Sequence, residues 1–124
     1  MPLVIFIDDC ETSLEITKMM TSSMPIDVKQ YMKAEVALDE IKSGMTPDLI
    51  ITDLHMPGMN GFDFLKSLLD FSSTKRTPCL MLTSETKSEI KEQGKALGFS
   101  GWMVKPVNST QLKQAITKTL RLPA

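Results

Sequence analysis

The sequence of 124 residues has few of the features that identify disulfide-rich, metal-thiolate or nucleic-acid-binding proteins. Its two cysteines, Cys10 and Cys79, lack the spacing of a metal or redox motif, so we expect reduced thiols in a cytoplasmic protein. The 14 Lys and Arg residues nearly balance the 15 Asp and Glu residues without clustering, which argues against a nucleic-acid partner. The apolar run at residues 3–7 is too short for a signal peptide or a membrane span, so no membrane insertion is expected.

Short apolar runs alternate with longer amphipathic segments along the chain. The predicted strands are Leu3–Ile7, Ile26–Tyr31, Leu49–Ile51, Leu80–Leu82 and Trp102–Val104. The second alternates between apolar and polar residues like an edge strand, whereas the others are continuously apolar, as in a sheet buried on both faces. A chain of this length forms one domain. We therefore predict a three-layer α/β fold over residues 1–124, with a doubly wound, five-stranded parallel sheet.

Amphipathic segments with helical spacing follow each predicted strand. The predicted helices are Thr12–Met24, Ala34–Ile41, Phe62–Leu69, Ile90–Leu97 and Leu112–Leu120. Pro25 is expected to end the first helix and Gly44 to follow the end of the second. The inward faces are predicted to contain Ile16, Met19 and Met20 in the first helix, and Phe62, Leu65, Leu68 and Leu69 in the third.

Polar residues follow four of the predicted strands: Asp8 and Asp9, Asp53, Thr83 and Lys105. In doubly wound sheets, ligands bind at this carboxyl edge, at the topological switch point. Three carboxylates in one pocket repel one another unless a cation lies between them, and Mg²⁺ prefers carboxylate oxygens. Lys105 adds a positive charge and Thr83 a hydroxyl donor. The pattern indicates that Asp53 attacks phosphorus and becomes an aspartyl phosphate.

Each of these residues taken alone has a simpler interpretation. A double aspartate after a strand is often a solvated turn, and Lys-Pro is a common loop dipeptide. A single Asp, Thr or Lys at a strand end carries little information. Chance placement of all of them at one sheet edge, in a fold that makes this edge a ligand site, is much rarer. The combination therefore favours the functional interpretation.

Four segments stand in a characteristic order: IFIDDCETS, LIITDLHMPGMNGFDFL, CLMLTSE and GFSGWMVKPV. In these segments, and over essentially its whole length, the chain resembles the receiver domains of two-component response regulators, most closely the chemotaxis CheY group. The resemblance implies the CheY-like, or flavodoxin-like, (βα)5 fold. It also implies a phosphoprotein of a two-component system rather than an enzyme that turns over a metabolite.

The resemblance assigns roles to the residues at the strand ends. Asp53 is the expected phosphorylation site. Its carboxylate, those of Asp8 and Asp9, and the backbone carbonyl of His55 are the expected ligands of Mg²⁺, for which Mn²⁺ can substitute. Thr83 corresponds to the switch hydroxyl. Lys105 corresponds to the lysine that contacts the phosphoryl group, and the Lys105–Pro106 bond matches a position that is cis in this family.

The sequence departs from the family pattern near the last strand. Trp102 stands where Tyr or Phe is usual, and it is expected to move inward with Thr83 or to be simply a packed edge-strand residue. Val107 stands where Phe is frequent, which implies a packing difference. His55 and Glu85, which lie two residues after Asp53 and Thr83, match positions that modulate the rate of dephosphorylation. Exposure of His55 at the rim of the pocket is an equally good interpretation.

No output domain is expected, because only Arg121 to Ala124 follow the last predicted helix. The implied partners are a CheA-like histidine kinase as phosphodonor, a flagellar motor switch protein or another protein target, and a phosphatase. Chemotaxis is the leading role, and a phosphorelay intermediate or phosphate sink is the alternative. Lys87, Lys91, Lys95 and Trp102 form either a partner-binding face or, for the lysines, a solvated helix side.

Two other functional classes share part of this pattern. An FMN carrier with the same fold needs a Ser-, Thr- or Gly-rich phosphate loop after the first strand, where this chain has Asp8 and Asp9. A phosphatase that forms an aspartyl phosphate carries a second Asp two residues after its nucleophile, where this chain has His55. Both classes are therefore disfavoured.

Overall fold

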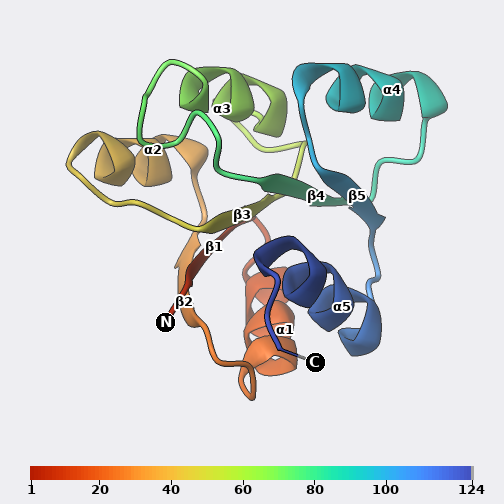
Figure 1. The fold of residues 1–124 in the computed structure, drawn as a ribbon. Helices are drawn as coiled ribbons and strands as arrows, with labels where there is room; N and C mark the ends of the chain where they lie inside the picture. The colour runs from red at the N-terminus through yellow and green to blue at the C-terminus, as the bar shows by residue number, and fades with distance from the viewer. Residues whose placement is uncertain (124) are drawn as a thin grey trace.

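A single parallel sheet with helices on both faces forms the frame of the structure, a computed structural model that describes residues 1–123 (Figure 1). Strands and helices alternate throughout. In chain order the elements are β1 (Leu3–Ile7), α1 (Glu11–Thr21), β2 (Asp27–Tyr31), α2 (Ala34–Lys42), β3 (Leu49–Thr52), α3 (Gly61–Leu68), β4 (Cys79–Thr83), α4 (Ser88–Leu97), β5 (Gly101–Val104) and α5 (Ser109–Leu120).

The strand order is β2-β1-β3-β4-β5, and every neighbouring pair is parallel. This confirms the predicted doubly wound sheet. The direction of winding reverses after β1, so the carboxyl ends of β1 and β3 flank the switch point. β1, β3 and β4 are paired on both sides and covered on both faces, which explains their uninterrupted apolar sequences.

Side chains that alternate along the strands divide the core into two layers. Ile5, Ile50 and Met81 pack toward α2, α3 and α4. Val4 and Leu80, with their neighbours on the same side, pack toward α1 and α5. Figure 1 shows α2, α3 and α4 above the sheet and α1 and α5 below it. The predicted three-layer arrangement is therefore confirmed.

Local signals fix several helix ends. The side chain of Asn60 accepts a hydrogen bond from the Asp63 amide at the start of α3. The side chain of Asn108 accepts one from the Gln111 amide at the start of α5. Gly44 follows α2 with a φ of 115°, a conformation that few other residues adopt, as its predicted role requires. Within residues 1–123, no helix is both long and apolar enough to cross a bilayer.

The predicted inward face of α1 is wrong at Ile16 and Met19, whereas Met20 packs against the core as predicted. Ile16 and Met19 are 46% and 75% exposed, and Thr17 and Thr21 are buried in their place. The Thr17 hydroxyl donates to the carbonyl of Leu14 at 3.1 Å, and the Thr21 hydroxyl donates to Thr17 at 2.9 Å. Because these hydroxyls are satisfied inside the helix, small threonines can face the core in place of larger apolar side chains.

The predicted limits of α1 and the predicted face of α3 also need correction. α1 ends at Thr21, not Met24, since two serines follow and Met24 precedes a proline, which disfavours helical backbone. In α3, Leu69 is 46% exposed, whereas Phe64, which was not predicted to face inward, is fully buried. Leu65 and Leu68 face the core as predicted.

Gly94 in the middle of α4 makes room for Trp102 on β5. A Cβ atom at this position would lie 2.6 Å from Cζ3 of Trp102 and 3.2 Å from Cε1 of Phe62. The Phe62 ring lies 6.4 Å from the Trp102 ring and 5.9 Å from the Phe99 ring, measured between centroids. A helical glycine and a large aromatic residue therefore fit together to join α4 to β5.

We predict that Gly94→Ala destabilises the protein by about 1 kcal/mol or more, because the added methyl group overpacks the Trp102 contact. An unconstrained Gly→Ala change inside a helix stabilises it by ~0.5–1 kcal/mol, so the sign of the effect is informative. Urea unfolding measures the change. The exposed Ala96→Gly in α4 calibrates helix propensity, and Trp102→Phe should relieve the clash in the double variant. A stabilising Gly94→Ala would contradict this account.

Candidate functional site

The carboxyl ends of β1, β3 and β5 bring three charged side chains together at the switch point. The ammonium nitrogen of Lys105 lies 2.6 Å from Oδ2 of Asp8 and 2.9 Å from Oδ2 of Asp53. These residues are 97 and 52 positions apart in the sequence. Lys105 follows β5 and precedes a cis bond to Pro106, as expected. The sheet thus joins residues that the sequence suggested only by their positions after strands.

Backbone amides fix the second oxygen of each buried carboxylate. Oδ1 of Asp53 accepts a hydrogen bond from the Leu54 amide at 2.6 Å, and Oδ1 of Asp8 accepts one from the Cys10 amide at 2.9 Å. Asp8 and Asp53 are 5% and 8% exposed. The two carboxylates are therefore held in defined orientations by their own loops and by Lys105.

Burial and pairing shift the charge equilibria in this pocket. Burial raises the pKa of the Asp8 carboxyl above its ordinary value, although the hydrogen bonds from Lys105 and the Cys10 amide oppose that shift. Burial alone would lower the pKa of Lys105, but the hydrogen bonds and charges of Asp8 and Asp53 outweigh it and raise the pKa. The ammonium group therefore remains charged at neutral pH.

A divalent cation fits the remaining charge. One ligand oxygen each from Asp8, Asp9 and Asp53 can be chosen so that all three lie within 4.8 Å of one another. Three carboxylates and one ammonium leave two negative charges, and the Asp9 carboxylate is exposed. Two oxygens bound to one Mg²⁺ at ~2.1 Å can be no more than ~4.2 Å apart. The carboxylate oxygens, which lie within 4.8 Å of one another, therefore need to move together only slightly to bind the ion. The donor set suits Mg²⁺, which accepts carboxylates and retains waters.

Thr83 ends β4 beside this pocket and is fully buried. Its hydroxyl oxygen accepts a hydrogen bond from the Glu85 amide at 3.3 Å. The sequence had not singled out Thr52, which is also buried and donates from its hydroxyl to the Asp53 carbonyl at 2.9 Å. A threonine that precedes an acidic strand end has no distinctive sequence signal, so only the structure reveals this support for the Asp53 backbone.

Glu85 connects the rim of the site to the neighbouring loop. Its carboxylate lies 2.9 Å from Nε2 of His55, whose side chain is exposed, and it also accepts the amides of Thr86 and Lys87. The bond to His55, followed by those from the two amides, lowers the pKa of Glu85 below its ordinary value. His55 is therefore exposed at the rim and paired with Glu85, whereas its role in dephosphorylation stays a prediction.

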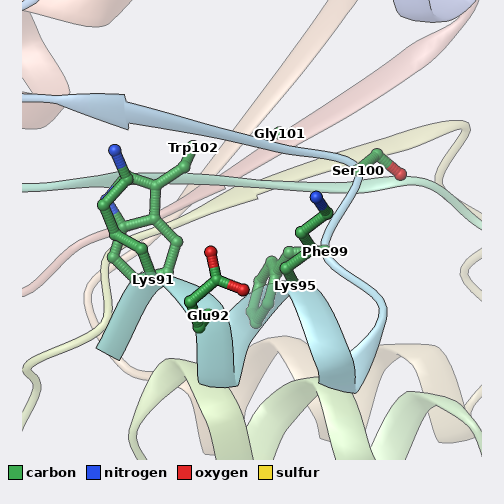
Figure 2. Close-up of a pocket in the computed structure, with 7 residues that line it drawn as sticks. All are labelled: Lys91, Glu92, Lys95, Phe99, Ser100, Gly101 and Trp102. Carbon is green, nitrogen blue, oxygen red and sulfur yellow. The ribbon is translucent and has the colours of Figure 1, made fainter. Parts of the chain in front are cut away.

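Trp102 is half-buried and reaches the same residue from β5. Its indole nitrogen donates to the backbone carbonyl of Glu85 at 3.3 Å. Beside the ring, α4 and β5 border a hollow of about 290 Å³ (Figure 2). The lining residues are Lys91, Glu92, Lys95, Phe99, Ser100, Gly101 and Trp102. Two of the three predicted lysines line this hollow, whereas Lys87 stands at the start of α4.

Comparisons with known proteins agree with this geometry. The family model described as the response regulator receiver domain matches residues 4–117, which include every strand end discussed above. Chemotaxis protein CheY-3 of Vibrio cholerae is 32% identical over 93% of this chain and 88% of its own length. Chemotaxis protein CheY of Pseudomonas aeruginosa is 30% identical over 93% of each chain. The solved structure of chemotaxis response regulator CheY4 of Vibrio cholerae has a TM-score of 0.88 and 35% identity, and the match covers 97% of this chain and 99% of that one.

We predict that Mg²⁺ raises the thermal stability of the wild type and that Asp9→Asn removes most of this effect. At ten times Kd, a cation that binds only the folded state stabilises it by ~1.4 kcal/mol. Thermal unfolding with and without Mg²⁺ measures the difference. Asp27→Asn, an exposed substitution at the amino end of β2, is the matched control. An equal response to Mg²⁺ in wild type and Asp9→Asn would contradict this cation site.

Proposed function

Because this chain belongs to the response regulator receiver domain family, we propose that it is a phosphorylation-dependent signalling switch with Asp53 as its phosphoacceptor. The observation that carries the proposal is the cluster of Asp8, Asp9 and Asp53 at the switch point of the sheet, with Lys105 paired to Asp8 and Asp53. The protein then changes its own covalent state and is not an enzyme that turns over a metabolite.

In the proposed reaction, a carboxylate oxygen of Asp53 forms a bond to phosphorus while the bond from phosphorus to the donor nitrogen breaks. The donor imidazole leaves with the electron pair and takes up a proton. The Lys105 ammonium and the Thr83 hydroxyl donate hydrogen bonds to the transferred phosphoryl oxygens and stabilise their negative charge. Asp8, Asp9, Asp53 and the carbonyl of His55 would hold Mg²⁺, which supplies further charge neutralisation when bound.

The contacts of Glu85 support a route from the phosphoryl group to the surface. The Thr83 hydroxyl accepts a hydrogen bond from the Glu85 amide, and the Glu85 carbonyl accepts one from the Trp102 indole. If Thr83 turns toward the phosphoryl group, it gives up the Glu85 amide and frees the loop that holds Trp102. Phosphorylation then shifts a two-state equilibrium of the β4–α4 loop and β5. The pairing of His55 with Glu85 favours a role for both in controlling access of water and hence dephosphorylation.

An apolar surface beside the site supports docking of a histidine kinase or its phosphotransfer domain as phosphodonor. A groove of about 320 Å³ runs between α1 and the segment after β5. Ile16, which is 46% exposed, and Val107 contribute to its lining, and Lys105 lies at its edge. An apolar partner helix in this groove would bring a phosphohistidine next to Asp53. Since such kinases use ATP, we propose that the protein acts in the cytoplasm.

We propose that the output leaves by protein–protein contact at the hollow between α4 and β5. The apolar rings of Phe99 and Trp102 and the charges of Lys91 and Lys95 offer a mixed surface of the kind that partners bind (Figure 2). The names of the relatives reported above favour a role in chemotaxis. From the resemblance to chemotaxis receivers, we propose a flagellar motor switch protein as the target. A phosphorelay intermediate or phosphate sink is the alternative, and it would use the same apolar groove at α1 to exchange the phosphoryl group with a phosphotransfer domain.

We predict that acetyl phosphate labels the wild type in the presence of Mg²⁺ and that Asp53→Asn abolishes the label. Beryllofluoride, a phosphoryl mimic, should change the fluorescence of Trp102, the only tryptophan. Thr83→Ala should retain the label but lose most of the fluorescence change, because it removes the switch hydroxyl and keeps the acceptor. Exposed Asp63→Asn is the control. Absence of both signals in the wild type would overturn the proposal, and label retained in Asp53→Asn would place the acceptor elsewhere.

We predict that beryllofluoride increases affinity for the flagellar motor switch protein about tenfold or more and that Lys95→Glu reverses most of this gain. Charge reversal at a docking surface changes the rate of association and the electrostatic complementarity of the two surfaces. Calorimetric titration measures the affinity, with exposed Lys42→Glu on α2 as control. No binding in either state, combined with transfer of phosphoryl from Asp53 to a histidine phosphotransfer domain, would favour the phosphorelay alternative.

A further inference from the structure

The loop between β3 and α3 has few fixed points although it follows the phosphoacceptor directly. It carries His55, whose carbonyl is a ligand in the proposed metal site, so any role of this loop in cation binding rests on that proposed function. At one end Oδ1 of Asp53 holds the Leu54 amide, and the Gly61 amide donates to the Leu54 carbonyl at 2.9 Å. Between these points, the His55 side chain is paired with Glu85 and does not bond the loop backbone.

Glu35, in the first turn of α2, reaches this loop from a different element. Its Oε2 atom accepts the amide of Met59 at 3.4 Å. Within residues 1–123, this is the only hydrogen bond from a side chain outside the loop to the backbone of residues 55–59. The bond is exposed, so the carboxylate stays solvated and burial does not penalise it.

A second observation places the same oxygen against the loop. Gly58 has a φ of +77°, and a Cβ atom built on it would lie 2.5 Å from Oε2 of Glu35. The left-handed backbone at Gly58 and the absence of a side chain there let the carboxylate approach closely. Gly58 and Met59, two neighbouring residues of the loop, thus both contact the same carboxylate oxygen of Glu35.

We infer that Glu35 is a positioning residue for the metal site: it holds the β3–α3 loop, and with it the His55 carbonyl, in the conformation that binds the cation. Glu35 touches neither the cation nor the phosphoryl group in this account. It acts by restricting a loop whose backbone supplies a ligand, as residues that orient metal ligands do. Without it, the cation must order the loop when it binds, and part of the binding free energy is lost.

The hydrogen bond must be distinguished from the charge of Glu35, because a carboxylate also attracts a cation through space. Glu35→Gln keeps an acceptor oxygen of the same reach and removes the charge. Glu35→Ala removes both. Positioning predicts that the glutamine variant binds the cation nearly as well as the wild type, whereas attraction through space predicts that both variants are equally weak.

The test measures Mn²⁺ binding by the loss of the free-ion electron paramagnetic resonance signal, so it needs no phosphorylation. Glu35→Ala is expected to raise Kd about 3- to 10-fold, the net size of one ordinary hydrogen bond, with Glu35→Gln within about twofold of the wild type. Hydrogen exchange of the Met59 amide should accelerate in Glu35→Ala without metal. The free energy of unfolding should change little, which separates positioning from a general loss of structure. Asp39→Ala, exposed on the same helix, is the control.

The outcomes separate this inference from the proposed function. Unchanged Mn²⁺ affinity in Glu35→Ala, together with weak binding in Asp9→Asn, would overturn the role of Glu35 and leave the metal site in place. Equal weakening in Glu35→Ala and Glu35→Gln would replace positioning with attraction through space. Absence of Mn²⁺ binding in the wild type would overturn the metal site and the role of Glu35 together.

Discussion

Two nearly buried carboxylates that share one ammonium group set the main physical constraint on this protein. Asp8 and Asp53 both contact Lys105, and neither is in contact with another cationic side chain within residues 1–123. Burying like charges side by side opposes folding, and the shared lysine offsets only part of that cost. Together with the exposed Asp9, these groups leave two negative charges at the edge of the sheet. This excess of negative charge is the physical basis of the proposed cation site and of the proposed phosphoacceptor role of Asp53.

One residue, Glu85, connects the surroundings of this pocket to β5 through hydrogen bonds. Glu85 uses its amide for Thr83, its carbonyl for Trp102 and its carboxylate for His55. In the proposed switch, a movement of the Thr83 hydroxyl would therefore affect both the rim of the site and β5. Trp102 in turn fits against Gly94, so its displacement must also involve α4. This packing gives the surface near α4 and β5 a mechanical connection to the site.

The sequence predicted the sheet better than the helix faces. Continuous apolar runs such as Leu49–Ile51 have few alternatives to a buried parallel strand, and all five predicted strands are present. The inward face of α1 was wrong because threonines that bond to their own helix can replace Ile16 and Met19 in the core. An isolated glycine in α4 was a usable signal of close packing, but its partner Trp102 was not identifiable from helical periodicity.

The sequence by itself determined which chemical groups the site contains, because acidic, hydroxyl and basic residues directly follow buried strands and parallel strands end at one edge. Only the tertiary structure decided which of these groups form hydrogen bonds and ion pairs with one another. The division of Lys105 between two carboxylates, the pairing of His55 with Glu85 and the reach of Glu35 to Met59 all join different elements. Such contacts depend on side-chain directions and loop paths, for which local sequence patterns carry no information.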